Sequence, residues 1–501
     1  MLRRLGFVAL FLAFALPLSA QNQGEFEKKV TEFTLSNGLH FLLVERHEAP
    51  VASFHTYVKA GSVNDATGTT GLAHMFEHMA FKGTETIGTT DWPAEKKAMD
   101  AVEHAYDELE AERAKGPRAD AKNVATLEQA AKMAVDRAQD YVKPNEYTRI
   151  IEENGGAGVN ASTNVAATEY FYSLPSNRIE LWFLLESQRF LHPVFREFYK
   201  ERDVVMEERR MRVESNPQGL LIQDFTAAAF QAHPYRNPPG GWPSDIRALR
   251  VRDAKAFYEK YYAPSNMVIA VVGDVNPAGA RRMVEKYFGP LPARPTPVPP
   301  HTEEPKQQGP RAITIENQAQ PLAAIGYKRP DQNDKDDAVF DALSIILASG
   351  RTSLLYQDMV EEKRLSLAAQ CVPTYPDGAF PNLFVFLLAP AQGHTLEENQ
   401  QELDAVLNRL STQQIDDATM ARVKAKVRAS VIAQLDNNAG LAALLTRAYA
   451  NYGDWRRLFT AIGDMEKVTP ADVQRVAAKY FVPNNRTTGY SGPAANAGGA
   501  R

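Results

Sequence analysis

Two histidines and a glutamate near residue 75 have the types and spacing that metal-dependent hydrolysis needs. His74, Glu77 and His78 fall within residues 71–81, and at about 100° per residue a helix there would carry all three on one side. Its other side would be apolar, formed by Leu72, Met75, Phe76, Met79 and Ala80. Two imidazoles one turn apart can bind one zinc ion, and Glu77 would lie beside it, where its carboxylate can accept a proton from water. This is the H-x-x-E-H pattern, and a helix whose histidines only face solvent explains neither the spacing nor the separation of the two faces.

The third metal ligand must come from another part of the chain, because catalytic zinc sites normally use three protein ligands. The acidic segment 201–210 offers Glu201 and Glu208, seven residues apart, which would share one helix face to within about 20°. Glu207 would lie about 100° further round the helix. An ordinary charged helix has the same spacing, so spacing alone leaves the third ligand open among these carboxylates.

The composition limits both the kind of metal site and the kind of partner. The 501 residues include one cysteine, Cys371, which excludes an internal disulfide and a paired-cysteine metal site, so His and carboxylate side chains must hold any metal. Lys and Arg number 56 against 61 Asp and Glu, a net charge of −5. This balance lacks the basic excess that contact with a phosphate backbone requires, and nucleic acid is not an expected partner.

The first 20 residues have the pattern of a signal peptide. Two arginines, Arg3 and Arg4, precede an apolar run over residues 5–18, and Ser19-Ala20 lies before the polar Gln21. The alternative is a membrane anchor, but the run is about six residues shorter than the roughly 20 that a spanning helix needs. We therefore expect cleavage near residue 20 and an exported protein, periplasmic or secreted, with no membrane span after cleavage.

The mature chain divides into two domains of related sequence. Residues 290–310 contain eight prolines among polar residues, which favours an extended linker between domains at 25–289 and 311–490. The segments 261–266 (YYAPSN) and 480–485 (YFVPNN) both follow helical patterns, so the two domains look like copies of one fold. Strands and helices do not alternate strictly, which favours an α+β fold. Residues 491–501 are rich in Gly and Ala and are expected to form a flexible tail.

Residues 92–142 differ from the rest of the first domain. They are dense in Ala, Glu, Lys and Asp, with Gly116-Pro117 in the middle, which predicts a hairpin of two long helices inserted into the domain. The hairpin could be a structural arm, or a gate or partner-docking surface.

Five segments together resemble the inverzincin family of zinc metallopeptidases, which includes pitrilysin, insulin-degrading enzyme and the mitochondrial processing peptidase. They are HMFEH (74–78) followed by MAFKGT (79–84), GG (155–156), NAST (160–163), the acidic segment 201–208, and HPY (233–235). The resemblance covers nearly the whole mature chain and is typical of bacterial two-domain members. It implies an α+β fold of two homologous domains, each a mainly antiparallel sheet with helices packed on it, as in mitochondrial processing peptidase-like metallohydrolases.

The resemblance also implies the role of individual residues. His74, His78 and Glu208 would bind one Zn²⁺ per chain, with Glu77 as general base. Glu201 matches a carboxylate that steadies a zinc-binding histidine in the family; otherwise it is a surface charge. The edge strand that pairs with the substrate backbone in the family matches residues Asn160, Ala161 and Ser162; otherwise Asn160 serves only its own turn.

The chain departs from the family pattern in two places. His78 and Glu208 are 130 residues apart, longer than is usual in the family by about the length of the predicted hairpin. The second departure concerns an Arg and a Tyr, seven residues apart, that stabilise the developing oxyanion in members complete in one chain. The matching positions here are Val360 and Leu367, and Arg364 could substitute only in another register. Loss of such donors would lower the rate by about 10²–10³.

These features predict a zinc-dependent endopeptidase that cleaves short or unfolded peptides in a chamber formed with a partner subunit. The partner would be a homologous chain that supplies the Arg/Tyr pair in a heterodimer, with a homodimer as the second possibility. The alternative function is a non-catalytic scaffold or peptide-binding subunit of the same fold.

Overall fold

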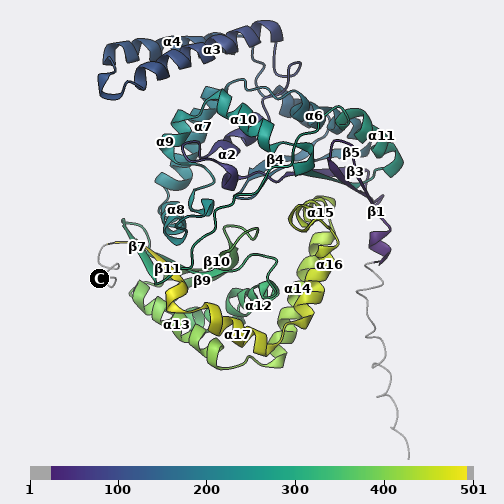
Figure 1. Cartoon of the computed structure of the whole chain (residues 1–501). Coiled ribbons are helices and arrows are strands. Elements are labelled where there is room, and N and C mark those ends of the chain that lie inside the picture. Colours follow the sequence, from purple (N-terminus) through teal and green to yellow (C-terminus); the bar gives the residue numbers. More distant parts are fainter. Residues whose placement is uncertain (1–23, 494–501) are drawn as a thin grey trace, which may run out of the picture.

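The computed structural model describes residues 24–493, which form two halves, each built on one β-sheet with helices packed against it (Figure 1). The first sheet has six strands in the order β1-β2-β6-β3-β5-β4, and its neighbouring strands are antiparallel except for β2 and β6. These strands are β1 (Val30–Thr34), β2 (His40–Glu45), β3 (Val51–Val58), β4 (Ala157–Thr163), β5 (Thr168–Pro175) and β6 (Met267–Gly273).

The second sheet repeats the order of the first without a counterpart of β1. Its order is β7-β11-β8-β10-β9, and β7 and β11 are its parallel pair. The predicted α+β fold of two related, mainly antiparallel sheet domains is therefore confirmed. The strands are β7 (Arg311–Glu316), β8 (Leu322–Arg329), β9 (Ser366–Tyr375), β10 (Asn382–Pro390) and β11 (Arg486–Gly492).

Helices cover both sheets. In the first half they are α2 (Leu72–Met79), α3 (Trp92–Arg113), α4 (Ala121–Gln139), α5 (Glu146–Glu153), α6 (Ile179–Leu191), α7 (Phe198–Arg209), α8 (Pro217–Ala229), α9 (Pro243–Ala248), α10 (Val251–Tyr261) and α11 (Pro277–Phe288). In the second half they are α12 (Asp337–Ala348), α13 (Leu396–Thr412), α14 (Asp417–Leu435), α15 (Asn438–Tyr452), α16 (Arg457–Lys467) and α17 (Pro470–Tyr480).

The two segments that repeat in the sequence, 261–266 and 480–485, make the same contacts in both halves. Asn266 Nδ2 donates to the carbonyl oxygens of Tyr261 (2.8 Å) and Lys59 (3.0 Å). Asn485 makes the equivalent two hydrogen bonds in the second half, at 2.9 and 2.7 Å. Each asparagine satisfies a carbonyl at the C-terminal end of a helix, which has no partner within the helix, and ties that end to the sheet.

One helix of each half packs on the sheet of the other half. Helix α8 packs on β7, β8 and β11 of the second sheet, where Phe225 lies in an apolar cluster with Leu383. Helix α15 packs on β3 and β6 of the first sheet, where Leu445 lies in a cluster with Val268. Figure 1 shows α8 and α15 between the two sheets. This exchange buries apolar surface of both halves at their junction.

An ion cluster around the buried carboxylate of Glu169 also joins the halves. Arg447 on α15 lies 2.8 Å from Glu169 on β5, and His55 on β3 lies 3.0 Å from the same carboxylate. Burial by itself would raise the pKa of Glu169, but the hydrogen bonds with His55 and Arg447 outweigh it, so that this pKa is lowered. The carboxylate therefore stays ionised and links the two halves.

The segment between the halves, residues 289–310, contains no helix or strand and is fully within the described chain. The predicted tail begins too early, because β11 pairs with its neighbours as far as Gly492. The predicted signal peptide, residues 1–20, and residues 494–501 lie outside the described residues. Between residues 24 and 493, no helix combines the length and the apolar character needed to cross a membrane.

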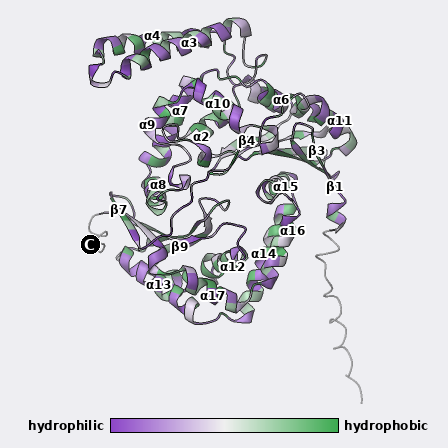
Figure 2. Cartoon of the chain, viewed as in Figure 1, coloured by the Kyte–Doolittle hydropathy of each residue, from purple (hydrophilic) through white to green (hydrophobic). Residues whose placement is uncertain are grey.

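Helices α3 and α4 form an antiparallel hairpin that projects from the first half (Figure 1). Asp91 begins α3 by accepting a hydrogen bond from Ala94 N (3.1 Å), and Asp120 begins α4 in the same way from Lys122 N (2.9 Å). Hydrophilic and hydrophobic residues are mixed along both helices (Figure 2). The apolar side chains Val102 and Leu109 are buried where the hairpin packs.

The base of the hairpin is fixed by a buried ion pair between Arg196 and Glu95. Arg196 Nε and Nη2 donate to the two carboxylate oxygens of Glu95 at 2.6 and 2.9 Å, and both side chains are 1% exposed. The same guanidinium donates to the carbonyl oxygens of Thr84 (3.0 Å) and Ile87 (2.8 Å). Arg196 therefore ties α3 to the loop that follows α2.

We expect Arg196→Met to lower the free energy of unfolding by about 3–5 kcal/mol, because it leaves the buried carboxylate of Glu95 without a counter-charge. Urea unfolding followed by circular dichroism measures the change. Arg113→Met is the matched control, since Arg113 pairs with Glu128 where both side chains are about half exposed, and exposed pairs contribute about 1 kcal/mol or less. Equal losses in the two variants would contradict the assignment.

Candidate metal centre

Helix α2 holds the predicted histidines and glutamate in place by packing its apolar face. The helix follows Gly71, whose φ of 88° lies in the left-handed region that favours glycine. Asp65, which is 7% exposed, accepts hydrogen bonds from Gly71 N (2.8 Å) and Ala73 N (3.0 Å) and so satisfies free N–H groups of the first turn. The buried side chains are Leu72, Ala73, Met75, Phe76 and Met79, and the partly exposed ones are His74, Glu77 and His78.

Helix α7 brings Glu208 to the two imidazoles of α2. Glu208 Oε2 lies 3.4 Å from His78 Nε2 and 3.7 Å from His74 Nε2, and the three donor atoms all lie within 4.8 Å of one another. Zinc bonds of about 2.0–2.1 Å in tetrahedral geometry would place neighbouring donors about 3.4 Å apart. The donor set and its spacing therefore fit a single zinc ion.

The two imidazoles have different electrostatic surroundings. Burial, and next the neighbouring His78, lower the pKa of His74 to about 4, so this ring is neutral at pH 7, as metal binding requires. Burial by itself would lower the pKa of His78 as well, but its hydrogen bond and charge interaction with Glu201 raise it. His78 therefore has a carboxylate partner behind it, whereas His74 Nδ1 is buried without a hydrogen-bond partner among the described residues.

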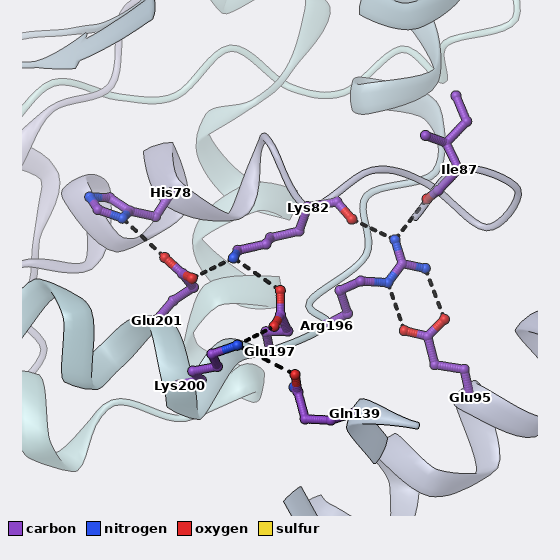
Figure 3. Close-up of polar contacts among 9 residues, drawn as sticks. All are labelled: His78, Lys82, Ile87, Glu95, Gln139, Arg196, Glu197, Lys200 and Glu201. Carbon is purple, nitrogen blue, oxygen red and sulfur yellow. Dashed lines mark hydrogen bonds and ion pairs between the residues drawn. The ribbon is translucent and has the colours of Figure 1, made fainter. Parts of the chain in front are cut away.

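Behind His78 lies a row of alternating charges (Figure 3). Glu201 Oε2 is 3.3 Å from His78 Nδ1, and the other oxygen of this carboxylate contacts Lys82. Lys82 Nζ also donates to Glu197 (3.1 Å), which accepts a second hydrogen bond from Lys200 (2.9 Å). Glu201 is only 9% exposed, so it is not the surface charge that the sequence left possible.

Glu77 lies on the same face of α2 as the histidines. Burial raises the pKa of its carboxyl group, while a hydrogen bond with the Thr163 side chain and the nearby His78 act in the opposite direction. The Glu77 carboxylate belongs to the same cluster as Glu208, because both carboxylates interact electrostatically with His78.

Glu207, the neighbour of Glu208, points elsewhere. Its side chain is 52% exposed and accepts two hydrogen bonds from Arg210, at 2.6 and 2.8 Å. Arg212, one turn after Glu208, lies 2.6 Å from Glu208 Oε1 and leaves Oε2 facing the imidazoles. These contacts therefore distinguish the two neighbouring carboxylates: Glu208 faces the imidazoles, whereas Glu207 is turned away from them.

The residues expected to pair with a substrate backbone lie on β4, at the edge of the first sheet. Asn160 and Ser162 are exposed, Ala161 is buried, and β4 lies beside α2. Asn160 Oδ1 accepts a hydrogen bond from Ala161 N (2.9 Å), so in this structure its side chain does serve its own strand. Within the described residues, no strand pairs with the outer edge of β4.

A cavity of about 510 Å³ borders His74 and Glu208. Its lining includes Arg209 and Arg212 from the first half and Tyr375 from β9 of the second half. The two halves also meet here through a hydrogen bond between the hydroxyl groups of Tyr375 and Thr226 (2.9 Å). The candidate metal centre therefore opens onto a space shaped by both sheets.

The positions that match the family's Arg/Tyr pair lie in the second half. Val360 is on a short helical segment, Tyr356–Glu362, and Leu367 is on β9 with 60% of its surface exposed. Arg364 lies between these elements, exposed, with a φ of 54°. Neither Val360 nor Leu367 has a side chain that donates a hydrogen bond.

Sequence reasoning missed the parts played by Lys82 and Arg212. Both follow a candidate ligand by four residues, Arg212 after Glu208 along a continuous helical segment and Lys82 after His78 in the loop that follows α2. On a helix this spacing brings side chains together, so it could have indicated the contact of Arg212 with Glu208 but not that of Lys82 with Glu201. It carries little weight alone, because most lysines and arginines on helices are solvated.

Two family models match most of the described chain. The family model for insulinase (peptidase family M16) matches residues 40–108 and 127–240, and the model for the peptidase M16 inactive domain matches residues 248–427. The unmatched residues 109–126 form the outer end of the α3–α4 hairpin, so the hairpin extends beyond the family model. In the described helix α12, which takes the place of α2 in the second half, there is no histidine.

Similar proteins cover nearly the whole chain. Zinc protease PqqE of Helicobacter pylori is 29% identical over 470 residues, 92% of each chain. The crystal structure of a protease from Helicobacter pylori aligns with 93% of this chain and 100% of its own, with a TM-score of 0.77 and 27% identity. The periplasmic protease PqqL of Escherichia coli shares the fold, with a TM-score of 0.68 and 16% identity, and this chain covers 47% of it. The predicted family is thereby confirmed, and the chain belongs to peptidase family M16, whose named members include zinc proteases.

Proposed function

We propose that this chain is a zinc-dependent endopeptidase in which His74, His78 and Glu208 hold one zinc ion and Glu77 acts as general base. The observation that carries the proposal is the approach of three donor atoms from α2 and α7 to within 4.8 Å of one another. Family membership supports the metal as zinc and the reaction as peptide hydrolysis.

The proposed roles follow from the position of each side chain. A zinc ion in such a site lowers the pKa of water to about 7 and polarises the scissile carbonyl group. Glu77 accepts the proton of the attacking water and returns it to the leaving amine. Glu201 accepts a hydrogen bond from His78 Nδ1 and so fixes the ring with Nε2 toward Glu208.

The substrate would be a short or unfolded peptide. An extended segment can add to the free edge of β4 along Asn160, Ala161 and Ser162, and the adjacent cavity of about 510 Å³ can take a side chain. The Asn160 side chain would have to release Ala161 N for this pairing. A segment whose backbone is already paired inside a folded protein cannot add to this edge.

A homologous partner subunit would supply what this chain lacks. Val360 and Leu367 leave the positions of the Arg/Tyr pair without donors, so we propose a heterodimer in which the partner brings both and closes a chamber around the site. A homodimer is the second possibility. The coverage of only 47% of Escherichia coli PqqL is compatible with a chain that acts as one half of a larger enzyme. Export to the periplasm or beyond rests on the sequence of residues 1–20 and on the periplasmic location in the name of that neighbour.

A quenched-fluorescence assay with an unfolded peptide tests the function. We expect slow, zinc-dependent cleavage by the chain alone, which stops with a chelator and returns with zinc. A homologous chain that carries the Arg/Tyr pair should raise the rate by about 10²–10³. A scaffold or peptide-binding subunit would bind the peptide and leave it intact under both conditions, and this result would overturn the proposal.

A further inference from the structure

Lys82 lies in the loop just after the C-terminal end of α2, the helix that carries both histidines. It follows His78 by four residues, and its side chain is 17% exposed. Its ammonium group contacts Glu201 directly and lies 3.1 Å from Glu197. It is the cation that touches the carboxylate directly behind His78.

The main chain of Lys82 is held as firmly as its side chain. Lys82 N donates to the carbonyl oxygen of Met79 (3.1 Å), and the Lys82 carbonyl accepts a hydrogen bond from the buried guanidinium of Arg196 (2.5 Å). Arg196 is in turn paired with Glu95 on α3. Lys82 is thus fixed at both ends, by the carboxylates of Glu197 and Glu201 and by Arg196 at the base of the hairpin (Figure 3).

The two oxygens of the Glu201 carboxylate contact different partners. One oxygen contacts Lys82, and the other lies 3.3 Å from His78 Nδ1. A carboxylate bound through one oxygen alone can turn about its side-chain bonds, whereas two opposite contacts hold it in one orientation. With that orientation fixed, His78 keeps its proton on Nδ1 and presents Nε2 to Glu208.

From these contacts we infer that Lys82 is a positioning residue of the metal centre, which holds Glu201 in the orientation that aims His78 at the zinc ion. The inference rests on the zinc site of the proposed function. It assigns to Lys82 an effect on metal affinity, with no contact to substrate.

The test compares zinc affinity in Lys82→Met and Lys200→Met by competition with a chromogenic chelator. Lys200 is the matched control, because it also pairs with Glu197, forms no ion pair with Glu201 in the described part of the chain and is 57% exposed. We expect Lys82→Met to weaken zinc binding about 10- to 100-fold, the size typical of losing a partner behind a metal-binding histidine. Lys200→Met should bind zinc as the unsubstituted chain does, and Lys82→Arg should recover most of the affinity.

A second pair of variants tests the inference in case Lys82→Met fails to fold. Lys82→Met leaves Glu197 and Glu201 close together without their shared cation, which could unfold the chain. The double variant Lys82→Met/Glu197→Gln removes one of these charges and is compared with Glu197→Gln alone, after circular dichroism has verified both folds. Equal zinc affinity within this pair, or between Lys82→Met and Lys200→Met, would overturn the inference. Failure of the unsubstituted chain to bind zinc would instead refute the proposed function.

Discussion

The Glu77→Gln chain is expected to fold and to bind zinc, yet to hydrolyse peptides about 10²–10⁴-fold more slowly than the unsubstituted chain. Glutamine has nearly the same shape as glutamate, so it can occupy the same place on α2 beside the histidines. It cannot accept the proton of the attacking water, so only the general-base step is lost. Peptide turnover by fluorescence and zinc content by metal analysis, measured on the same sample, separate the two effects.

Glu85→Gln is the control for this substitution. Glu85 is exposed in the loop that follows α2, close in sequence to the site but outside its cluster. It carries the same change in charge and should leave both turnover and zinc content unaltered. Full turnover by Glu77→Gln would refute the role of Glu77, and a parallel loss of zinc would make it part of the metal-binding set.

The fold class could be predicted because its signals are local, whereas the arrangement of the sheets could not. Periodicity and the repeated YYAPSN and YFVPNN segments indicated two related α+β domains. Strand order depends on pairings between distant residues, such as His40 with Val268 in the parallel pair of β2 and β6. The exchange of α8 and α15 was equally hidden, because an apolar helix face shows that it is buried but not which sheet covers it.

The candidate site shows the same limit: the sequence indicated which face of a helix is buried, but not which distant residues contact one another. Helical spacing separated the faces of α2 correctly, as the burial of Met75 and the partial exposure of His74 show. It could not distinguish Glu208 from Glu207 without the family resemblance, because the choice depends on contacts across the fold. Arg210 draws Glu207 outward, while Glu208 meets the imidazoles of another helix.

The α3–α4 hairpin is linked to the metal centre through a series of contacts. Its outer end lies outside the family model, but its base is joined through Glu95 and Arg196 to the loop that carries Lys82. Lys82 in turn contacts the carboxylate behind His78. The hairpin is therefore anchored at its base to the elements that hold the metal centre.

The Glu208→Gln chain is expected to lose zinc affinity by more than about 100-fold, because outer partners alone change affinity 10- to 100-fold and Glu208 supplies a charged ligand. Arg212 lies 2.6 Å from Oε1 and leaves Oε2 to the two imidazoles, so an amide whose oxygen keeps the contact with Arg212 turns its NH2 group, which cannot bind zinc, toward them. Zinc stoichiometry after dialysis against a mild chelator measures the loss, and peptide cleavage should fall with it. Glu207→Gln is the matched control: it is the adjacent residue on α7, half exposed and paired with Arg210, and should retain zinc. Unchanged zinc in Glu208→Gln together with loss in Glu207→Gln would transfer the ligand to Glu207, and unchanged zinc in both would show that neither carboxylate of this segment completes the site.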